Sequence, residues 1–318
     1  MNDTLAIVVP CFNEEECLET CINSLSGILL KLIEKEKISS QSHIIFSDDG
    51  STDKTWEIIQ HHSTLTSMVK GIKLSRNKGH QIALFAGLSQ ANADITISID
   101  ADLQDDITVI EQMVDAYHAG YDIVYGVRND RTTDTLFKRK TAEIFYNLMS
   151  LMGVEQVKNH ADFRLMSRRA VKALVEHNEQ NMYLRGLVPL VGFNSTNVYY
   201  SRLERFAGES KYPFKKMLSL ALGGITSFSV TPLRIITAVG FSISVLSFIL
   251  ALYAVISKLN GNTVQGWTSV IIAIFFLGGI QMLCIGIIGE YVGKIYMESK
   301  KRPKYFIDKT TSNQQENK

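Results

Sequence analysis

The sequence predicts an α/β protein built on a mostly parallel sheet with helices on both faces, followed by two membrane-spanning helices. Two observations support the sheet. Short apolar runs alternate with helical segments in the N-terminal part of the chain, and polar clusters follow these runs. A third observation supports the spans, because this charge-rich part gives way to two long apolar stretches nearer the C-terminus.

Five apolar runs have the length and composition of strands that are buried on both faces. They are Leu5 to Val9, His43 to Ser47, Gly71 to Ser75, Asp94 to Ile99 and Asp122 to Val127. Helical patterns lie between them, from Glu14 to Lys37, after the capping residue Asp53, from Gln81 to Gln90 and from Ile107 to Ala119. This alternation implies parallel strands, and ligands of such sheets bind beyond the carboxyl ends of the strands.

The stretches Ile235 to Ile256 and Trp267 to Gly289 contain no charged residue. Each is long enough to supply the ~20 residues with which a helix crosses a bilayer. Two buried core helices are the alternative, and two neighbouring charge-free stretches make it the weaker one. Lys and Arg residues flank the pair on the outside, whereas Lys258 is the only cation in the short loop between the spans. The positive-inside rule therefore predicts that both termini lie in the cytoplasm and the short loop outside.

These observations divide the chain into a cytoplasmic domain (1–210), a juxtamembrane segment (211–232), a two-helix hairpin (233–290) and a basic tail (291–318). Two amphipathic segments, 136–152 and 214–228, are predicted to lie in the membrane interface; packing on the soluble domain is the alternative. The net charge of +1 does not indicate nucleic acid binding. The sequence leaves open whether the chain forms a homo-oligomer.

The most informative polar cluster follows the fourth predicted strand. Asp100 and Asp102, separated by Ala101, point to the same side of an extended segment, and Gln104 adds another oxygen. Carboxylate and amide oxygens are the ligands that Mg²⁺ and Mn²⁺ prefer, and such an ion would neutralise a leaving diphosphate. The alternative is a polar turn in which Asp105 or Asp106 caps the next helix.

Three further clusters follow the first three strands. After the first strand, Phe12 could stack on a base and Glu14 or Glu15 could reach a ribose hydroxyl. Asp48 could accept a hydrogen bond from a base, and Lys78 supplies a cation near the same edge. Ordinary turns and helix caps are the alternative for each cluster. Four consecutive strand ends of this kind favour a pocket for a nucleotide diphosphate.

Several of these motifs together resemble family 2 inverting glycosyltransferases. The resemblance is strongest to the branch that includes dolichyl-phosphate mannose synthase and the bactoprenol glucosyltransferases. The motifs are Val8 to Glu15, Asp48 to Asp53, Asp100 to Asp105, Ala161 to Arg164, Arg205 to Tyr212 and the paired C-terminal spans. Phe12 stands where the family often has Tyr, and Asp106 where it usually has Pro. The Gln-x-x-Arg-Trp element of processive synthases is missing, since Gln180 to Gly186 has no Trp.

The resemblance implies a GT-A, Rossmann-like domain whose Pro10, Phe12, Glu14 and Asp48 hold the base and ribose. It also implies that Asp100 and Ala101 contact the nucleotide sugar and that Asp102, a catalytic residue, binds Mg²⁺ or Mn²⁺ together with Gln104. The expected reaction is single, inverting transfer of a hexose from a nucleotide sugar to undecaprenyl phosphate or a related lipid. UDP-glucose is the favoured donor. UDP-N-acetylhexosamine and GDP-mannose remain alternatives, as does a membrane scaffold that binds a nucleotide sugar without turnover.

The predicted nucleophile is the phosphate of the lipid. Its second pKa of roughly 6 makes it largely anionic already, so a strong general base is less necessary. Asp162 is the candidate that orients the acceptor or takes its residual proton, and a structural pair with Arg164 is the alternative. Arginines grip phosphate with two N–H groups, and the candidates for the lipid phosphate are Arg128, Arg131, Arg139 and Arg205.

Overall fold

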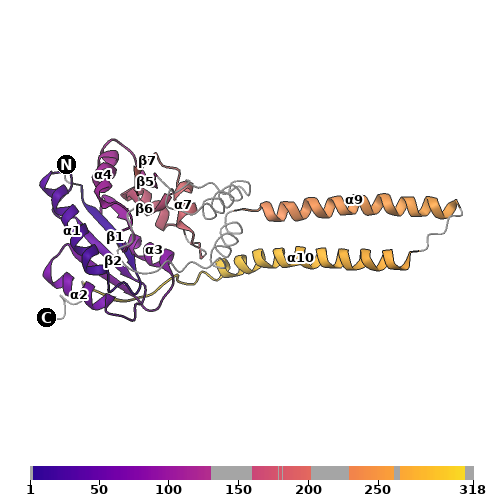
Figure 1. Ribbon diagram of the computed structural model, residues 1–318, viewed down its shortest axis with the longest axis horizontal. Coiled ribbons are helices and arrows are strands. Elements are labelled where there is room, and N and C mark those ends of the chain that lie inside the picture. The colour runs from indigo at the N-terminus through magenta and orange to yellow at the C-terminus, as the bar shows by residue number, and fades with distance from the viewer. Residues whose placement is uncertain are drawn as a thin grey trace. The chain divides into compact units, whose positions relative to one another are not determined.

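The computed structural model describes residues 3–129, 160–177, 179–180, 182–201, 229–260 and 266–311. The chain divides into two compact units (Figure 1). The first comprises 1–146, 155–213 and 302–318, and the second comprises 147–154 and 214–301. The predicted interface segments 136–152 and 214–228 lie outside the described residues, as do Arg131, Arg139 and Arg205.

The first unit contains one eight-stranded sheet with the strand order β7-β5-β6-β4-β1-β2-β3-β8. Its strands are β1 (Leu5–Cys11), β2 (His43–Asp48), β3 (Val69–Leu74), β4 (Ile95–Ser98), β5 (Ile123–Arg128), β6 (His160–Ser167), β7 (Ser195–Tyr200) and β8 (Ile307–Thr310). Its helices are α1 (Leu18–Glu34), α2 (Thr55–Leu65), α3 (His80–Gln90), the short η1 (Ile107–Val109), α4 (Ile110–His118), α6 (Arg168–Val175) and α7 (Leu184–Leu190). Strands β1 to β4 pair in parallel, as do β5 and β7. The predicted α/β class and the five predicted strands are confirmed.

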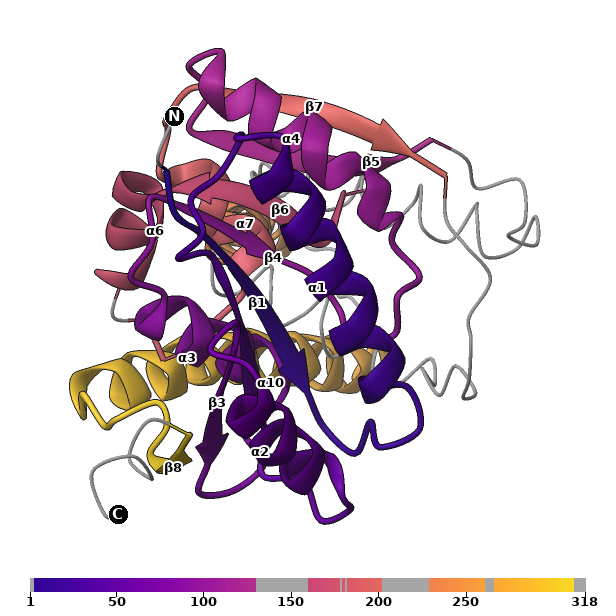
Figure 2. The ribbon, with the colours of Figure 1, turned by 90° about the vertical axis from the view of Figure 1, so that its left-hand side faces the viewer.

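Helices cover both faces of this sheet (Figure 2). Leu5, Ile7 and Val9 of β1 point into the main core, which α1, α2 and α4 close. The intervening β1 residues face α3. Gly87 permits close packing there, since a Cβ at this position would lie 2.4 Å from Val8 Cγ1. The central strands are therefore buried on both faces, as their continuous apolar runs predict.

Strand β6 is the main departure from the predicted alternation. It runs antiparallel to both β4 and β5, between which it lies. The sequence does not indicate a strand here, because the polar residues Asp162 and Arg164 interrupt the apolar pattern of a central strand. In the structure both of these side chains are buried, and each is paired with the other.

The chain after the second long helix also differs from the predicted basic tail. Strand β8 pairs antiparallel with β3 at the edge of the sheet. The amide of Thr311 donates to the Gly71 carbonyl, and the amide of Gly71 donates to Thr311 Oγ1, both at 3.0 Å. The ring of Tyr305 packs edge-on against Phe85 with centroids 6.5 Å apart. Residues 302–311 are thus part of the first unit.

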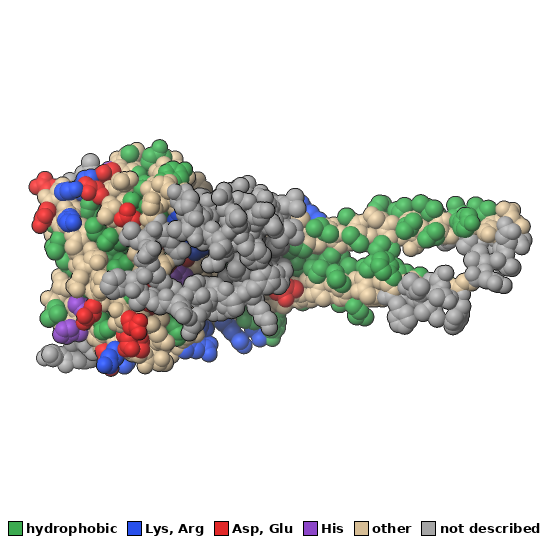
Figure 3. Space-filling view, in the orientation of Figure 1, with side chains coloured by type: hydrophobic (Ala, Val, Ile, Leu, Met, Phe, Trp, Pro, Cys, Tyr) green, Lys and Arg blue, Asp and Glu red, His purple; other side chains and the backbone are tan. Residues whose placement is uncertain are grey.

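The second unit contains the helices α9 (Thr231–Leu259) and α10 (Trp267–Ser299). Both have segments that are long and apolar enough to cross a membrane, Thr231–Leu250 and Phe276–Ser299, and no residue of either segment is buried. Figure 3 shows hydrophobic side chains along the described parts of both helices. Because these apolar surfaces are exposed, the helices are not the core of a water-soluble domain, which was the alternative.

Candidate active site

The carboxyl ends of four strands meet at one edge of the sheet. Strand β1 lies between β4 and β2, and β3 follows β2, all in parallel register. Cys11 at the end of β1 is level with Asp48, and Val8 is level with Ser98, two residues before Asp100. The four polar clusters therefore lie side by side, as the predicted parallel sheet requires.

Hydrogen bonds lock the loop after β1 onto the loop after β2. The backbone amide of Asn13 donates to Ser51 Oγ at 2.9 Å, and Asn13 Oδ1 accepts from the amide of Thr52 at 3.0 Å. The amide of Glu14 donates to Thr55 Oγ1 at 2.9 Å. Asn13 has a positive φ of 53°, so the backbone turns sharply there and the residues before and after it project from the sheet edge.

The residues predicted to hold the nucleotide differ in their accessibility. Phe12 is 41% exposed, which leaves its ring available for stacking. Glu14 is partly exposed, although its carboxylate accepts a hydrogen bond from Cys17 Sγ at 3.1 Å. Pro10 and Asp48 are buried. Asp48 accepts from the amide of Ser51 at 2.9 Å and lies 3.5 Å from Lys73 Nζ. It therefore stabilises the loop after β2 from a buried position.

The loop after β3 is fastened to the end of β2. The carboxylate of Asp49 accepts hydrogen bonds from the backbone amides of Lys78 at 2.7 Å and Gly79 at 2.8 Å. Gly50 lies against the same loop with φ +71°, and a Cβ there would be 2.8 Å from the backbone carbon of Arg76. These contacts fix the place of Lys78 and the start of α3.

Replacing Gly50 with alanine should therefore strain the backbone and push the loop at Arg76 away. We expect a loss of about 1–3 kcal/mol of stability, from the positive φ and the steric contact together. Thermal unfolding of the full-length protein in detergent measures this change. Gly27→Ala is the control, because nothing lies within 4 Å of a Cβ at Gly27; equal stability of the two variants would contradict the close approach.

The acidic loop after β4 has the features of a divalent cation site. The amide of Gln104 donates to Asp102 Oδ1 at 3.2 Å, and Leu103 between them has a positive φ of 50°. This turn brings the two predicted metal ligands onto one short loop. Ala101 is buried, and its carbonyl oxygen lies 3.7 Å from Cys17 Sγ.

Asp100 supports the same interpretation. Its Oδ1 is buried and accepts no hydrogen bond, although His80 Nε2 lies 3.5 Å away. Burial raises the pKa of Asp100 to about 6, even though His80 acts in the opposite direction. A buried carboxylate oxygen without a donor is stabilised by a cation, so the residues of this loop fit Mg²⁺ or Mn²⁺.

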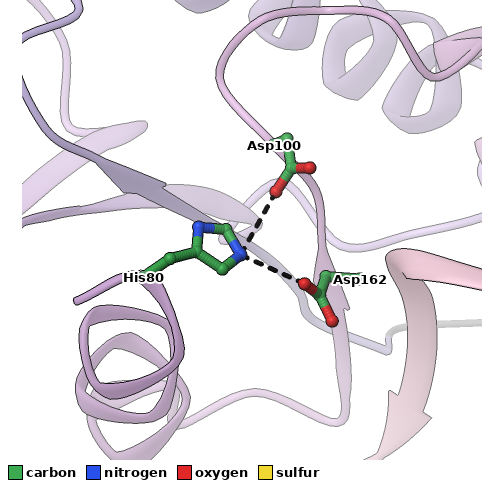
Figure 4. Close-up of side chains that lie close together, drawn as sticks. All are labelled: His80, Asp100 and Asp162. Atoms are coloured by element: carbon green, nitrogen blue, oxygen red, sulfur yellow. Dashed lines mark hydrogen bonds and ion pairs between the residues drawn. The ribbon is translucent and has the colours of Figure 1, made fainter. Parts of the chain in front are cut away.

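His80, Asp100 and Asp162 lie together beside this loop (Figure 4). His80 Nε2 is 3.1 Å from Asp162 Oδ2 and 3.5 Å from Asp100 Oδ1. One ligand atom of each residue lies within 4.8 Å of the others, which is close enough for a shared metal ion. The surroundings of Asp162 disfavour an ion at that end of the cluster, since two guanidinium groups already contact its carboxylate.

Asp162 is the centre of a buried network. Its carboxylate accepts from Arg164 at 2.6 Å, from Arg185 at 3.2 Å and from Gln81 Nε2 at 3.2 Å. Burial alone would raise the pKa of Asp162, but Arg185, His80 and Arg164 hold it well below its usual range. The structure thus contains the pair with Arg164, and a carboxylate held anionic in this way is a weak proton acceptor.

Arg128, a predicted ligand of the lipid phosphate, is engaged inside the protein. Its guanidinium donates to Asp105 Oδ1 at 2.9 Å through one terminal nitrogen, and its Nε lies 3.3 Å from both Asp105 Oδ1 and the hydroxyl of Tyr200. The other three predicted arginines lie outside the described residues.

Several residues of the site were not singled out by their sequence pattern. His80, Gln81 and Arg185 all contact Asp162, and Tyr200 contacts Asp105. They come from α3, α7 and β7, which are distant in sequence from their partners. Only His80 had a local signal, because it is the last residue of the polar cluster Arg76 to His80 that ends the third predicted strand.

The comparisons with known proteins agree with this geometry. Residues 6–188 match the model of glycosyl transferase family 2, and residues 231–295 match that of the GtrB C-terminal hairpin. An uncharacterized glycosyltransferase, YkoT, of Bacillus subtilis (strain 168) is 53% identical over 98% of this chain and 93% of its own length. The bactoprenol glucosyl transferase of Shigella phage SfV is 42% identical over 95% of this chain and 97% of its own length.

Among solved structures, glucosyl-3-phosphoglycerate synthase from Mycobacterium tuberculosis aligns over 70% of this chain and 78% of that chain, with a TM-score of 0.45 and 18% identity. The family assignment rests on the sequence matches, which cover the α/β domain and the hairpin separately. Together with the sheet and the acidic loop, they establish that this chain belongs to glycosyltransferase family 2 and has its GT-A type of α/β domain.

Proposed function

We propose that this glycosyltransferase transfers glucose from UDP-glucose to undecaprenyl phosphate or a related polyisoprenyl phosphate, with inversion at the anomeric carbon. The observation that carries the proposal is the acidic loop at the edge of a family 2 domain, in a chain whose relatives include bactoprenol glucosyl transferases. The product would be a β-linked lipid-phosphate sugar that serves glycan modification.

The donor would bind across the ends of β1, β2 and β4. Phe12, whose ring is exposed, would stack on the base, and the partly exposed Glu14 would accept from the ribose. Asp102 and Gln104 would hold Mg²⁺ or Mn²⁺, which supplies charge neutralisation for the leaving diphosphate when bound. Asp100 would add a negative charge to the same site, and Lys78 would add a positive charge.

The acceptor phosphate needs no strong base, because it is already largely anionic near neutral pH. Positioning and neutralisation of charge should dominate catalysis. We infer that Asp162 orients the acceptor side of the site by fixing Arg185 and His80, while Arg131, Arg139 and Arg205 remain the proposed ligands of the lipid phosphate.

The two apolar helices would anchor the enzyme at the plasma membrane, where the lipid acceptor resides. The excess of Lys and Arg outside the hairpin supports an arrangement with both termini and the catalytic domain in the cytoplasm. Nucleotide sugars and the phosphate of the lipid would then meet on the same side of the bilayer.

An assay with a panel of donors tests this proposal. Purified full-length protein is incubated with Mn²⁺ or Mg²⁺, undecaprenyl phosphate and radiolabelled UDP-glucose, UDP-N-acetylglucosamine or GDP-mannose. We expect label in the lipid fraction with UDP-glucose, sensitivity of the product to mild acid, and loss of transfer after EDTA treatment. NMR of the product establishes the anomeric configuration.

The same assay identifies the outcomes that would contradict the proposal. Transfer from another donor alone would replace glucose while keeping the reaction. Binding of a nucleotide sugar without transfer to lipid or water, under all metal conditions, would instead point to a binding scaffold.

A further inference from the structure

The C-terminal end of the acidic loop is held by a cluster of three residues, of which Asp105 and Tyr200 are buried and Arg128 is partly exposed. Asp105 lies three residues after Asp102 and directly after Gln104, and it is only 2% exposed. Its Oδ1 accepts from Arg128 at 2.9 Å and from the Tyr200 hydroxyl at 2.5 Å. A buried carboxylate needs such partners, because without them its desolvation would cost several kcal/mol.

The two partners of Asp105 belong to strands and not to the loop itself. Arg128 is the last residue of β5 and Tyr200 the last of β7, and the two are paired in the parallel register. The amide of Asn129 also donates to the Tyr200 carbonyl at 2.8 Å, which extends this pairing by one bond. The side chain of Tyr200 is fixed further by Phe163 of β6, whose ring lies edge-on at 5.5 Å.

Contacts fix the loop between β4 and η1 at other points as well: Ala101 is buried with its carbonyl oxygen 3.7 Å from Cys17 Sγ, and Leu103 packs against the main core. The amide of Ile99 donates to the Val8 carbonyl at the start of the loop, and Asp106 caps η1 through the amide of Thr108 at its end. Between these points the backbone turns through the left-handed Leu103. Asp105 directly follows Gln104, whose amide donates to Asp102 Oδ1, so the anchoring of Asp105 contributes to the direction in which Gln104 and Asp102 point.

We propose that Asp105, Arg128 and Tyr200 form a latch that positions the metal-binding loop, and that Arg128 is a positioning residue and not a ligand of the lipid phosphate. Arg128 uses its Nε and one terminal nitrogen, the edge with which arginine grips an oxyanion, on Asp105 and Tyr200. Its side chain is 27% exposed, and Asp105 raises the pKa of this guanidinium against the effect of burial. The inference rests on the proposed metal-dependent binding of the donor.

Binding of UDP by the full-length protein in detergent tests the latch without any need for the acceptor. Calorimetric titrations with UDP are made at several Mn²⁺ concentrations for the wild type, Tyr200→Phe, Arg128→Lys and Arg128→Leu. Residues that orient metal ligands typically change metal affinity by about 10- to 100-fold. We expect Arg128→Leu to raise the Mn²⁺ concentration needed for UDP binding by this factor, with Tyr200→Phe and Arg128→Lys in between.

Arg169→Leu is the matched control. Arg169 pairs with the buried Asp122 just before β5, at the opposite end of the strand from Arg128. Removing it should lower the melting temperature while leaving Mn²⁺-dependent UDP binding unchanged. Tyr200→Phe removes a single hydroxyl and keeps the ring against Phe163, so it tests the latch even if Arg128→Leu folds poorly.

Two results would overturn the inference while leaving the proposed function intact. One is unchanged UDP binding in both Arg128→Leu and Tyr200→Phe. The other is a raised KM for polyisoprenyl phosphate in the Arg128 variants, with UDP binding unchanged, which would restore Arg128 as an acceptor ligand. Failure of the wild-type protein to bind UDP with Mn²⁺ would instead overturn the proposed function, and the latch with it.

Discussion

Asp102→Asn is expected to reduce glycosyl transfer by on the order of 10³-fold or more while leaving the protein folded. The substitution keeps the size of the side chain but removes the negative charge that would hold the divalent ion. Asp102 is partly exposed at the sheet edge, and asparagine keeps the Oδ1 that accepts from the amide of Gln104. The loss should therefore be one of metal and donor binding, with little change in stability.

Three measurements on the same preparation separate these effects: transfer to lipid, Mn²⁺-dependent UDP binding and the melting temperature. Asp106→Asn is the matched control, because Asp106 lies in the same loop but accepts from the amide and hydroxyl of Thr108 as a helix cap. Full activity of Asp102→Asn in the presence of EDTA would remove Asp102 from the role proposed for it.

The edge of the sheet was predictable because each strand carries its own signal. Continuous apolar runs at β1, β2 and β4 predict strands buried on both faces, and polar clusters directly after them must then share an edge. This argument alone predicts that Asp102 and Phe12 lie at the same edge of the sheet. The hairpin was equally predictable, since charge-free stretches such as Ile235 to Ile256 are rare outside membranes.

What could not be predicted depends on contacts between distant segments. The buried Arg164 is acceptable in β6 only because Asp162 neutralises it, and a single sequence does not show that pairing. The edge strand β8 follows the hairpin and joins β3, more than 230 residues earlier in the chain. Arginine is a common phosphate ligand, so the sequence made Arg128 a candidate. Only the structure shows that its guanidinium is hydrogen-bonded to Asp105 and Tyr200.

Asp162→Ala should destabilise the protein by about 3–5 kcal/mol, the usual cost of removing one partner of a buried ion pair. Arg164 is 1% exposed, so the substitution would leave its guanidinium buried without a counter-charge. Arg185 and Gln81 would lose the same acceptor. A fall in melting temperature measures the effect. Asp115→Ala is the control, because its pair with Lys37 is exposed and such pairs contribute about 1 kcal/mol or less.

Asp162→Asn distinguishes a positioning role from that of a general base. A base could be replaced by asparagine with loss of activity but little loss of stability. The network predicts instead that Asp162→Asn is also unstable, since a neutral amide cannot balance Arg164 and Arg185. Adding Arg164→Met to Asp162→Asn should then recover much of the stability, because an apolar side chain of similar length replaces the unpaired charge. The opposite result would identify Asp162 as the base: an Asp162→Asn variant that is inactive but as stable as the wild type, and that Arg164→Met does not stabilise further.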